Sequence, residues 1–325
     1  MKKVLDEIRK AVKKAKTALI ATHIDPDGDA IGSQVALGMI LEKLGLSVSL
    51  YCADEVPRAY RFLAGTEKVK REVFPQNNFD IVFVVDCSVL DRAGDKIDLR
   101  KLSGLMINID HHPDNSQFGD INYVMKTSSV SEEIFDICQY FKIKIDKPIA
   151  DCLYTAMITD NGNFRYENTT PKTFKIAAEL LKAGVDTHDL TTRIYDNRSI
   201  SAIKLSARAM LELKTSPDRK IAWSTVTEKM MLDTAAKGED LLGMVDRIRS
   251  IEGVEVAILF REDKGRVKIN FRSKDRVNVS EIARRFGGGG HAKAAGAIVE
   301  GPLDKAQEKV VTEVQKQLEA LKFLV

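Results

Sequence analysis

The chain has 325 residues, about twice the length of a usual domain, so we expect two domains that each bury a core of their own. Its 50 Lys and Arg residues nearly balance 47 Asp and Glu residues, and the net charge of +3 argues against binding long duplex nucleic acid or an anionic membrane. With 44% hydrophobic and 30% charged residues, the composition excludes a disordered or fibrous chain.

The sequence also predicts a compartment. No stretch approaches the roughly 18 consecutive apolar residues of a membrane helix. The segment Met1–Lys16 is amphipathic and rich in lysine, without the apolar core of a secretion signal. Four scattered cysteines, with no metal-binding or redox spacing, are expected to be reduced and buried. We therefore expect a cytoplasmic protein.

Apolar, β-branched runs alternate with helical patterns through the first half of the chain. The pattern predicts strands at 18–22, 48–52, 81–86 and 105–110, and helices at 31–44, 148–159 and 173–183. Such alternation is typical of a mainly parallel sheet with helices on both faces.

A second, smaller mixed α/β domain is predicted in the remainder of the chain. A long helical pattern at roughly 189–213 predicts a linker helix. A strand at 220–227 and a helix at 240–250 follow, and then the strands 254–261 and 266–272, whose short glycine-containing turn predicts a β-hairpin. We expect an α/β protein with domains at 1–187 and 218–325 and a linker at 188–217.

Acidic and imidazole side chains stand where three predicted strands and one predicted helix end. They are His23, Asp27 and Asp29 after the first strand, Asp86 as the last residue of the third, Asp110 as the last residue of the fourth with His111 and His112 after it, and Asp160 after the helix 148–159. Chemistry in open parallel sheets lies beyond the carboxyl ends of the strands, so we expect these groups to converge on one rim.

Converging carboxylates repel one another unless a cation lies between them. Oxygen and imidazole ligands without sulfur suit Mn²⁺ or Mg²⁺, and the carboxylates suffice for two ions. Taken singly, the acidic segment 23–29 is explained as a turn, Asp86 as a strand-end cap, and the histidine pair as one packed and one exposed ring. However, four of the five histidines lie in these loops or in the glycine run of the second domain, which favours the metal site.

That glycine run, Gly287–Gly290, precedes His291. Bare glycines let successive backbone N–H groups face an anion, so the run predicts a phosphate-binding loop, with a flexible surface loop as the alternative. Arg272, at the end of a predicted strand, is a candidate for a charge-assisted contact to the same anion. For Arg272, as for Arg165 and Arg198, a solvated arginine is an equally good interpretation.

These motifs resemble those of the DHH phosphoesterase superfamily. Asp110-His111-His112 matches the triplet that names it, and segments 23–30, 85–87 and 159–164 resemble its first, second and fourth motifs. Segment 287–296 resembles the signature of the DHH-associated C-terminal domain. The resemblance covers essentially the whole chain, and the two-domain arrangement is similar to that of the bacterial nano-RNases. It implies an active site in the cleft between the two domains.

The resemblance implies a centre of two Mn²⁺ ions, with Mg²⁺ as the alternative. One ion would be held by His23, Asp27 and Asp86. The other would be held by Asp29, Asp86, His111 and Asp160, so that Asp86 bridges the two. Asp25 is not counted as a ligand, because this position varies in the superfamily.

The expected catalytic residues are Asp86, Asp110, which would orient an imidazole, and His112. The expected substrate contacts are His112, Arg272, Gly288, Gly289, Gly290 and His291. The implied activity is that of a phosphodiesterase or exoribonuclease-type hydrolase, in which a bridging metal-bound hydroxide attacks the phosphorus. Its substrates would be short oligoribonucleotides, pApA and cyclic-di-AMP, cleaved to mononucleotides, and pAp, cleaved to AMP by a bisphosphate nucleotidase activity.

Two other functions stay open from the sequence. A manganese-dependent inorganic pyrophosphatase of the superfamily shares the first domain but lacks the glycine-histidine motif. A non-catalytic nucleotide sensor would keep the fold without the reaction. The sequence does not choose among the nucleotide substrates, the cleavage polarities, or a monomer and a homodimer.

Overall fold

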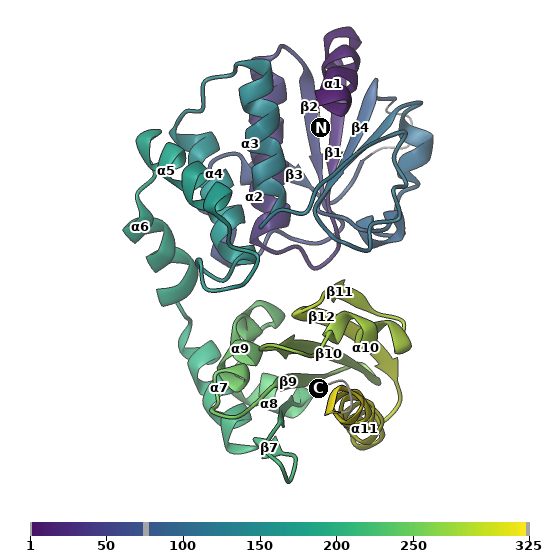
Figure 1. Ribbon diagram of the computed structural model, residues 1–325, viewed down its shortest axis with the longest axis vertical. Coiled ribbons are helices and arrows are strands. Elements are labelled where there is room, and N and C mark those ends of the chain that lie inside the picture. The colour runs from purple at the N-terminus through teal and green to yellow at the C-terminus, as the bar shows by residue number, and fades with distance from the viewer. Residues whose placement is uncertain (1, 74–77, 323–325) are drawn as a thin grey trace. The chain divides into compact units, whose positions relative to one another are not determined.

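The structure is a computed structural model that describes residues 2–73 and 78–322, and it divides into two compact units between Asn197 and Arg198 (Figure 1). This boundary lies inside the range 188–217, where the sequence predicts one linker helix. The structure has no single helix there. It has α6 (Thr187–Thr191), a π-helical turn η5 (Thr192–Asp196) and α7 (Ile200–Leu211). Leu205 and Ala209 of α7 belong to a hydrophobic core of the second unit, so α7 is part of that unit.

The first unit is built on a parallel sheet of six strands among the described residues, as the sequence predicts. In spatial order they are β3 (Val69–Lys70), β2 (Ser47–Tyr51), β1 (Thr17–Ala21), β4 (Ile81–Val85), β5 (Met106–Asp110) and β6 (Ile121–Val124). The central strands β1, β4 and β5 are almost fully buried, which explains why they appear in the sequence as continuous apolar runs.

Alternate residues of these strands enter two different cores. Ile20, Phe83 and Ile107 pack under α-helices. Leu19 and Val82 face the opposite side, which the 3-10 helices η3 (Leu90–Ala93) and η4 (Leu99–Leu102) cover. The α-helices of the first core are α1 (Lys2–Lys14), α2 (Gly28–Lys43), α3 (Val130–Phe141), α4 (Lys147–Asp160), α5 (Pro171–Lys182) and α6. Helical segments therefore cover both faces, as predicted, but on one face they are short.

Two glycines let α2 lie unusually close to α4. A Cβ atom at Gly32 would stand 2.4 Å from the backbone oxygen of Cys152, and one at Gly28 would stand 2.4 Å from Oγ1 of Thr159. Because α2 starts with Gly28 and α4 ends with Asp160, this contact brings the first turn of α2 beside the end of α4.

Substituting Ala for Gly32 is therefore expected to destabilise the first unit. The gain in helix propensity, about 1 kcal/mol, is outweighed by overpacking against a backbone oxygen, which typically costs about 1–3 kcal/mol. Urea unfolding followed by circular dichroism measures the change. Gly104→Ala is the control, since a Cβ there meets nothing within 4 Å. Equal stability of the two variants would contradict the close contact.

The second unit is a mixed α/β domain built on one sheet, as predicted. The described strands are β11 (Gly289–His291), β12 (Ala294–Glu300), β10 (Arg266–Ser273), β9 (Val256–Asp263), β8 (Ile221–Val226) and β7 (Lys214–Thr215), in this spatial order. Only the β8–β9 pair among them is parallel. The predicted hairpin is β9–β10, and its turn residues Lys264 and Gly265 both have positive φ.

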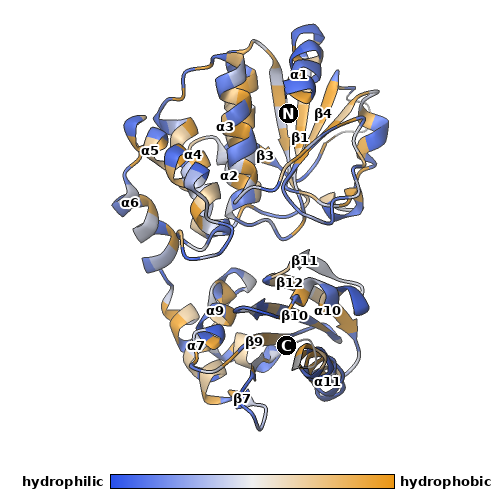
Figure 2. Cartoon of the chain, viewed as in Figure 1, coloured by the Kyte–Doolittle hydropathy of each residue, from blue (hydrophilic) through white to orange (hydrophobic). Residues whose placement is uncertain are grey.

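Helices cover both faces of this second sheet. One core contains residues of α10 (Val279–Arg285) and α11 (Leu303–Lys322), and the other contains residues of α7 and α9 (Met244–Arg249). The short helix α8 (Glu228–Thr234) packs on α7, and the helix predicted at 240–250 is divided between η6 (Gly238–Leu241) and α9. Figure 2 shows the hydropathy of both units, with mostly hydrophobic residues in β1 and β4 of the first unit and many hydrophilic ones in α1 of the first unit and α11 of the second.

Two further expectations concern the cysteines and the membrane. Cys52, Cys87, Cys138 and Cys152 are all buried free thiols, which confirms the prediction. In the part of the chain that the structure describes, no helix combines the length and the apolar character needed to cross a membrane.

Candidate metal centre

Three neighbouring strands deliver the predicted polar residues to one rim. Strands β1, β4 and β5 are adjacent and parallel, so the segments after them start at the same edge of the sheet. Asp86 follows β4, Asp110 is the last residue of β5, and Asp160 is the last residue of α4. Within the described residues, the predicted ligands form groups whose ligand atoms all lie within 4.8 Å of one another.

The first group consists of His23, Asp27 and Asp86. His23 Nδ1 donates a hydrogen bond to the carbonyl of Ile24 at 2.7 Å, which leaves Nε2 facing the carboxylates. This Nε2 lies 3.5 Å from Oδ2 of Asp86 and 4.0 Å from Oδ1 of Asp27. Oδ1 of Asp27 also caps α2, because it accepts hydrogen bonds from the backbone N–H groups of Asp29 and Ala30.

The second group consists of Asp29, His111 and Asp160. His111 Nε2 lies 3.7 Å from Oδ2 of Asp29 and 3.6 Å from Oδ2 of Asp160. It also lies 3.7 Å from Oδ1 of Asp86, whereas Oδ2 of Asp86 is the oxygen near His23. The two oxygens of Asp86 therefore face different groups.

The electrostatics of the rim call for a cation. Burial, together with the charges of Asp86 and Asp160, raises the pKa of Asp29 well above its usual value. Burial also raises the pKa of Asp160 to about 7, although His111 opposes the shift. Burial alone would raise the pKa of Asp86, but its hydrogen bond to His23 and the nearby imidazoles outweigh burial and lower it. Oδ1 of Asp86 accepts no hydrogen bond among the described residues. A cluster of buried carboxylate oxygens and imidazole nitrogens is a ligand set that suits divalent cations.

Asp110 holds His112 and not His111. His112 Nδ1 donates to Oδ1 of Asp110 at 2.7 Å, and Asn115 donates to the other oxygen, Oδ2, at 2.6 Å. Asn115 also donates to the side chain of Asn108, which lies two residues before Asp110 on β5. Burial by itself would lower the pKa of His112, but the hydrogen bond and charge of Asp110 raise it to about 9.

Some supporting residues were not identified from the sequence. Asn108 is fully buried and lies two positions before Asp110 on β5. Alternate residues of a strand point to the same face, so this spacing could have indicated that Asn108 lies on the same face as Asp110. Nothing in the sequence distinguished Asn115 from an ordinary turn residue. Asp25, which was not counted as a ligand, accordingly lies outside these groups, and its backbone N–H donates to Asp54.

In the second unit, the glycine run has a different local role from the predicted loop of free N–H groups. Gly287 has φ of +73° and ends α10, and its N–H donates to the carbonyl of Arg284. The N–H of Gly288 donates to Ala283, so this pair of bonds forms a Schellman cap and neither N–H is available to an anion. Gly289 and Gly290 belong to β11. A Cβ at Gly288 would stand 2.0 Å from the oxygen of Gly296, so close strand packing explains this glycine.

Arg272 and His291 are brought together by the register of the second sheet. Arg272 pairs with Ala294, and Ala294 pairs with His291. Directly paired residues of antiparallel strands project from the same face, so Arg272 and His291 lie on one face with a small alanine between them. The other two arginines contact backbone carbonyls within their own units, Arg165 at Gly162 and Arg198 at Leu242.

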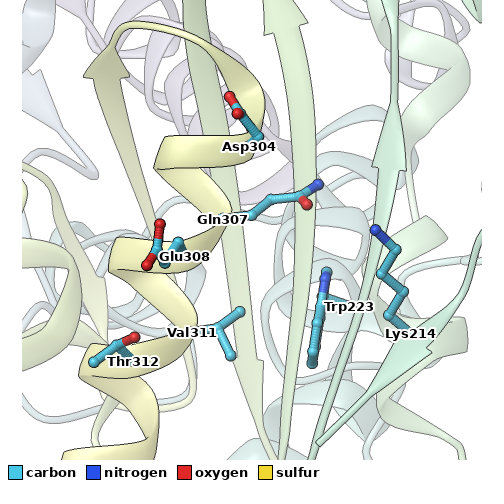
Figure 3. Close-up of a pocket in the computed structure, with 7 residues that line it drawn as sticks. All are labelled: Lys214, Trp223, Asp304, Gln307, Glu308, Val311 and Thr312. Atoms are coloured by element: carbon cyan, nitrogen blue, oxygen red, sulfur yellow. The ribbon is translucent and has the colours of Figure 1, made fainter.

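A separate pocket of about 340 Å³ lies between β8 and α11 of the second unit. Figure 3 shows Trp223 of β8 facing Val311 of α11, with Lys214 beside it. Asp304 and Glu308 are exposed, and no histidine or cysteine lines the pocket. It therefore does not offer a ligand set like that of the rim.

Comparisons with known proteins agree with the motifs. The model of the DHH family, N-terminal domain, matches residues 17–157, and that of the DHHA1 domain matches residues 219–320. A Thermus thermophilus protein named bifunctional oligoribonuclease and PAP phosphatase is 33% identical over 324 residues, covering 99% of this chain and 96% of that protein. A Bacillus subtilis protein of the same name is 28% identical, covering 90% of this chain and 92% of that protein.

A solved structure extends the similarity to three dimensions. The crystal structure of an exopolyphosphatase-related protein from Bacteroides fragilis has a TM-score of 0.87 and 28% identity, covering 100% of this chain and 98% of that one. Together with the ligand groups at the ends of β1, β4 and β5, these similarities show that the chain belongs to the DHH family, with a DHH domain followed by a DHHA1 domain.

Proposed function

We propose that this chain is a metal-dependent phosphoesterase that hydrolyses short oligoribonucleotides and pApA to mononucleotides and pAp to AMP. The observation that carries the proposal is the pair of neighbouring ligand groups, with one oxygen of Asp86 near the histidine of each. The names of the relatives from Thermus thermophilus and Bacillus subtilis support the choice of oligoribonucleotides and pAp. Cyclic-di-AMP is a further candidate substrate.

The proposed ligands divide into two sets with one common member. His23, Asp27 and Asp86 would hold one divalent cation, and Asp29, Asp86, His111 and Asp160 would hold the other. Mn²⁺ is the proposed ion, with Mg²⁺ as the alternative. When bound, such a pair lowers the pKa of water toward about 7 and neutralises charge on the phosphoryl oxygens.

The side chains of the rim keep these ligands in place. Ser33 Oγ and the backbone N–H of Val130 each donate to one oxygen of Asp29, at 2.8 Å in both cases. Asp110 fixes the orientation of His112, which we propose contacts the substrate phosphate. None of these groups needs to act as a covalent nucleophile.

The second unit is proposed to bind the nucleotide. Arg272 and His291 share one face of its sheet, and we propose that both donate to a phosphate there. Arg272 itself donates to the carbonyl of Phe271 and lies 3.7 Å from Asp246, so a phosphate would compete with that carboxylate. Gly289 and Gly290 would allow close approach beside His291. Gly288 would contribute only through the packing of β11 on β12, because its N–H is occupied. In this proposal residues 1–187 carry the reaction and residues 218–325 hold substrate.

His291→Ala is expected to raise KM for pApA by about 10- to 100-fold, with a smaller change in kcat, because it removes a hydrogen bond to a charged group. Steady-state kinetics with saturating metal measure both constants. His188→Ala is the matched control, since His188 is an exposed histidine of α6. An unchanged KM for His291→Ala would remove this residue from the proposed binding face.

The proposed function is tested by stripping the protein with a chelator and restoring Mn²⁺ or Mg²⁺ separately. Each form is then incubated with pApA, pAp, cyclic-di-AMP, a short oligoribonucleotide and pyrophosphate, and the products are separated chromatographically. Metal-dependent release of AMP from pApA, pAp or the oligomer supports the proposal and ranks the substrates. Cleavage of pyrophosphate alone would identify a pyrophosphatase instead, and binding without turnover would identify a sensor.

A further inference from the structure

A short segment, Thr127–Val130, contacts the second ligand group from outside. The backbone N–H of Val130 donates to Oδ2 of Asp29 at 2.8 Å. The carbonyl of Thr127 lies 3.3 Å from Nδ1 of His111. A carbonyl oxygen only accepts, so Nδ1 carries the proton and Nε2 is the atom presented to the carboxylates.

The same segment reaches the third member of the group through a neighbouring amide. Asn168 Nδ2 donates to the carbonyl of Ser128 at 3.0 Å, and it lies 3.5 Å from both the carbonyl and Oδ2 of Asp160. Four consecutive residues thus contact, directly or through one side chain, all three of Asp29, His111 and Asp160.

Two consecutive buried carboxyl groups hold this segment. Glu133, 0% exposed, accepts a hydrogen bond from Oγ1 of Thr127 at 2.7 Å. Glu132, 1% exposed, accepts from Oγ of Ser128 and from Oγ1 of Thr173 in α5, each at 2.7 Å. Consecutive positions of a helix point about 100° apart, so each glutamate reaches a different partner.

Burial of these groups is costly in itself. Removing a carboxylate from water costs several kcal/mol unless it is well paired, and burial accordingly raises the pKa of Glu133 well above its usual value, which favours the neutral acid. Lys172 lies 3.6 Å from Glu132, but among the described residues no cation lies within ion-pair distance of Glu133. Two apolar residues in the first turn of α3 would avoid this cost. We therefore look for a role of Glu132 and Glu133 other than stabilising the fold.

We propose that Glu132 and Glu133 are positioning residues for the half of the metal centre formed by Asp29, His111 and Asp160. They fix the carbonyl of Thr127 and the N–H of Val130, which in turn fix the ring of His111 and the carboxylate of Asp29. The inference rests on the proposed function, because it assigns these ligands to a cation. It predicts that losing either glutamate weakens one ion and spares the one held by His23, Asp27 and Asp86.

The test is a titration of the full-length, metal-stripped chain with Mn²⁺, in which the signal of free Mn²⁺ is followed by electron paramagnetic resonance. Glu133→Met removes the acceptor at similar volume, and Glu133→Gln keeps an acceptor oxygen for Thr127. We expect two ions in the wild type, a loss of about 10- to 100-fold in affinity for one of them in Glu133→Met, and recovery to near wild-type affinity in Glu133→Gln.

Asp136→Asn is the matched control. Asp136 lies on the same helix and accepts hydrogen bonds from Lys172 and Tyr123, away from the segment 127–130. A merely structural role of Glu133 would lower the thermal stability of the metal-free chain and leave both Mn²⁺ affinities intact, and this result would overturn the inference.

Thr127→Val covers the case in which Glu133→Met does not fold, since it removes only the hydroxyl group that Glu133 accepts from. Two unchanged Mn²⁺ sites in folded Thr127→Val would then overturn the inference. Loss of one site, with rescue in Thr127→Ser, would support it. A wild-type chain that binds no Mn²⁺ would instead refute the proposed function, so the two failures are distinguishable.

Discussion

Asp86→Asn is expected to lower kcat for pApA by about 10³-fold or more, which corresponds to a loss of roughly 4 kcal/mol of transition-state stabilisation. Asp86 is the only proposed ligand whose two oxygens face different groups, with Oδ2 near His23 and Oδ1 near His111. Removing its charge therefore weakens both halves of the centre at once. Steady-state kinetics at saturating Mn²⁺ and an Mn²⁺ titration of the same variant measure the effect.

Asparagine is the right replacement for a reason of backbone geometry. Asp86 has φ of +53°, a left-handed conformation that asparagine tolerates better than most residues. Alanine there would add backbone strain to the loss of the ligand, and the two effects could not be separated. Asp91→Asn, at an exposed position of η3 in the following connection, controls for the loss of one negative charge. Turnover within tenfold of wild type in Asp86→Asn would exclude a shared ligand.

Chelation of divalent cations is expected to destabilise the first unit strongly. Asp29 and Asp86 are 1% and 3% exposed, and without cations the buried carboxylates of the rim repel one another. An ion at about 1,000 times its dissociation constant adds about 4 kcal/mol to the free energy of unfolding. Thermal melts in excess chelator and in excess Mn²⁺ measure the difference.

Asp86→Asn provides the control for this experiment, because it should gain much less stability from Mn²⁺ than the wild type. Potassium chloride at equal ionic strength separates specific binding from screening. Coincident melting curves of the wild type with chelator and with Mn²⁺ would contradict a resident metal centre.

The central strands could be predicted because they are buried on both faces. The strand predicted at 18–22 is β1 at Thr17–Ala21, and the run predicted at 81–86 is β4 at Ile81–Val85. The two-residue strand β3 and the half-exposed strand β6 were not predicted, because neither contains a continuous apolar run. The prediction of one linker helix was wrong. The helical pattern at 189–213 spans the boundary between the two units, where α6 is followed by a π-helical turn before α7 begins.

The convergence of the proposed ligands was predictable because parallel strands end at one edge, so acidic residues after neighbouring strands lie close together. The support behind them was not. Residues 127–133 look like a polar turn followed by the acidic first turn of an exposed helix, and only burial distinguishes Glu132 and Glu133 from such a start. For Gly287 and Gly288 the predicted anion-binding role was wrong, because their N–H groups cap α10 and Gly288 packs closely on β12, and both roles favour glycine as an anion-binding loop does.

The order of the ligands along the chain has a consequence for biosynthesis. His23, Asp27 and Asp86 are all present once the ribosome has translated residue 86, whereas the other group waits for Asp160 at the end of α4. Every pairing in the first sheet is parallel and therefore joins segments distant in sequence, which makes such sheets slow to form. A nascent chain thus holds one complete set of proposed donors long before the other, so the proposed second cation can bind only after α4 has been translated.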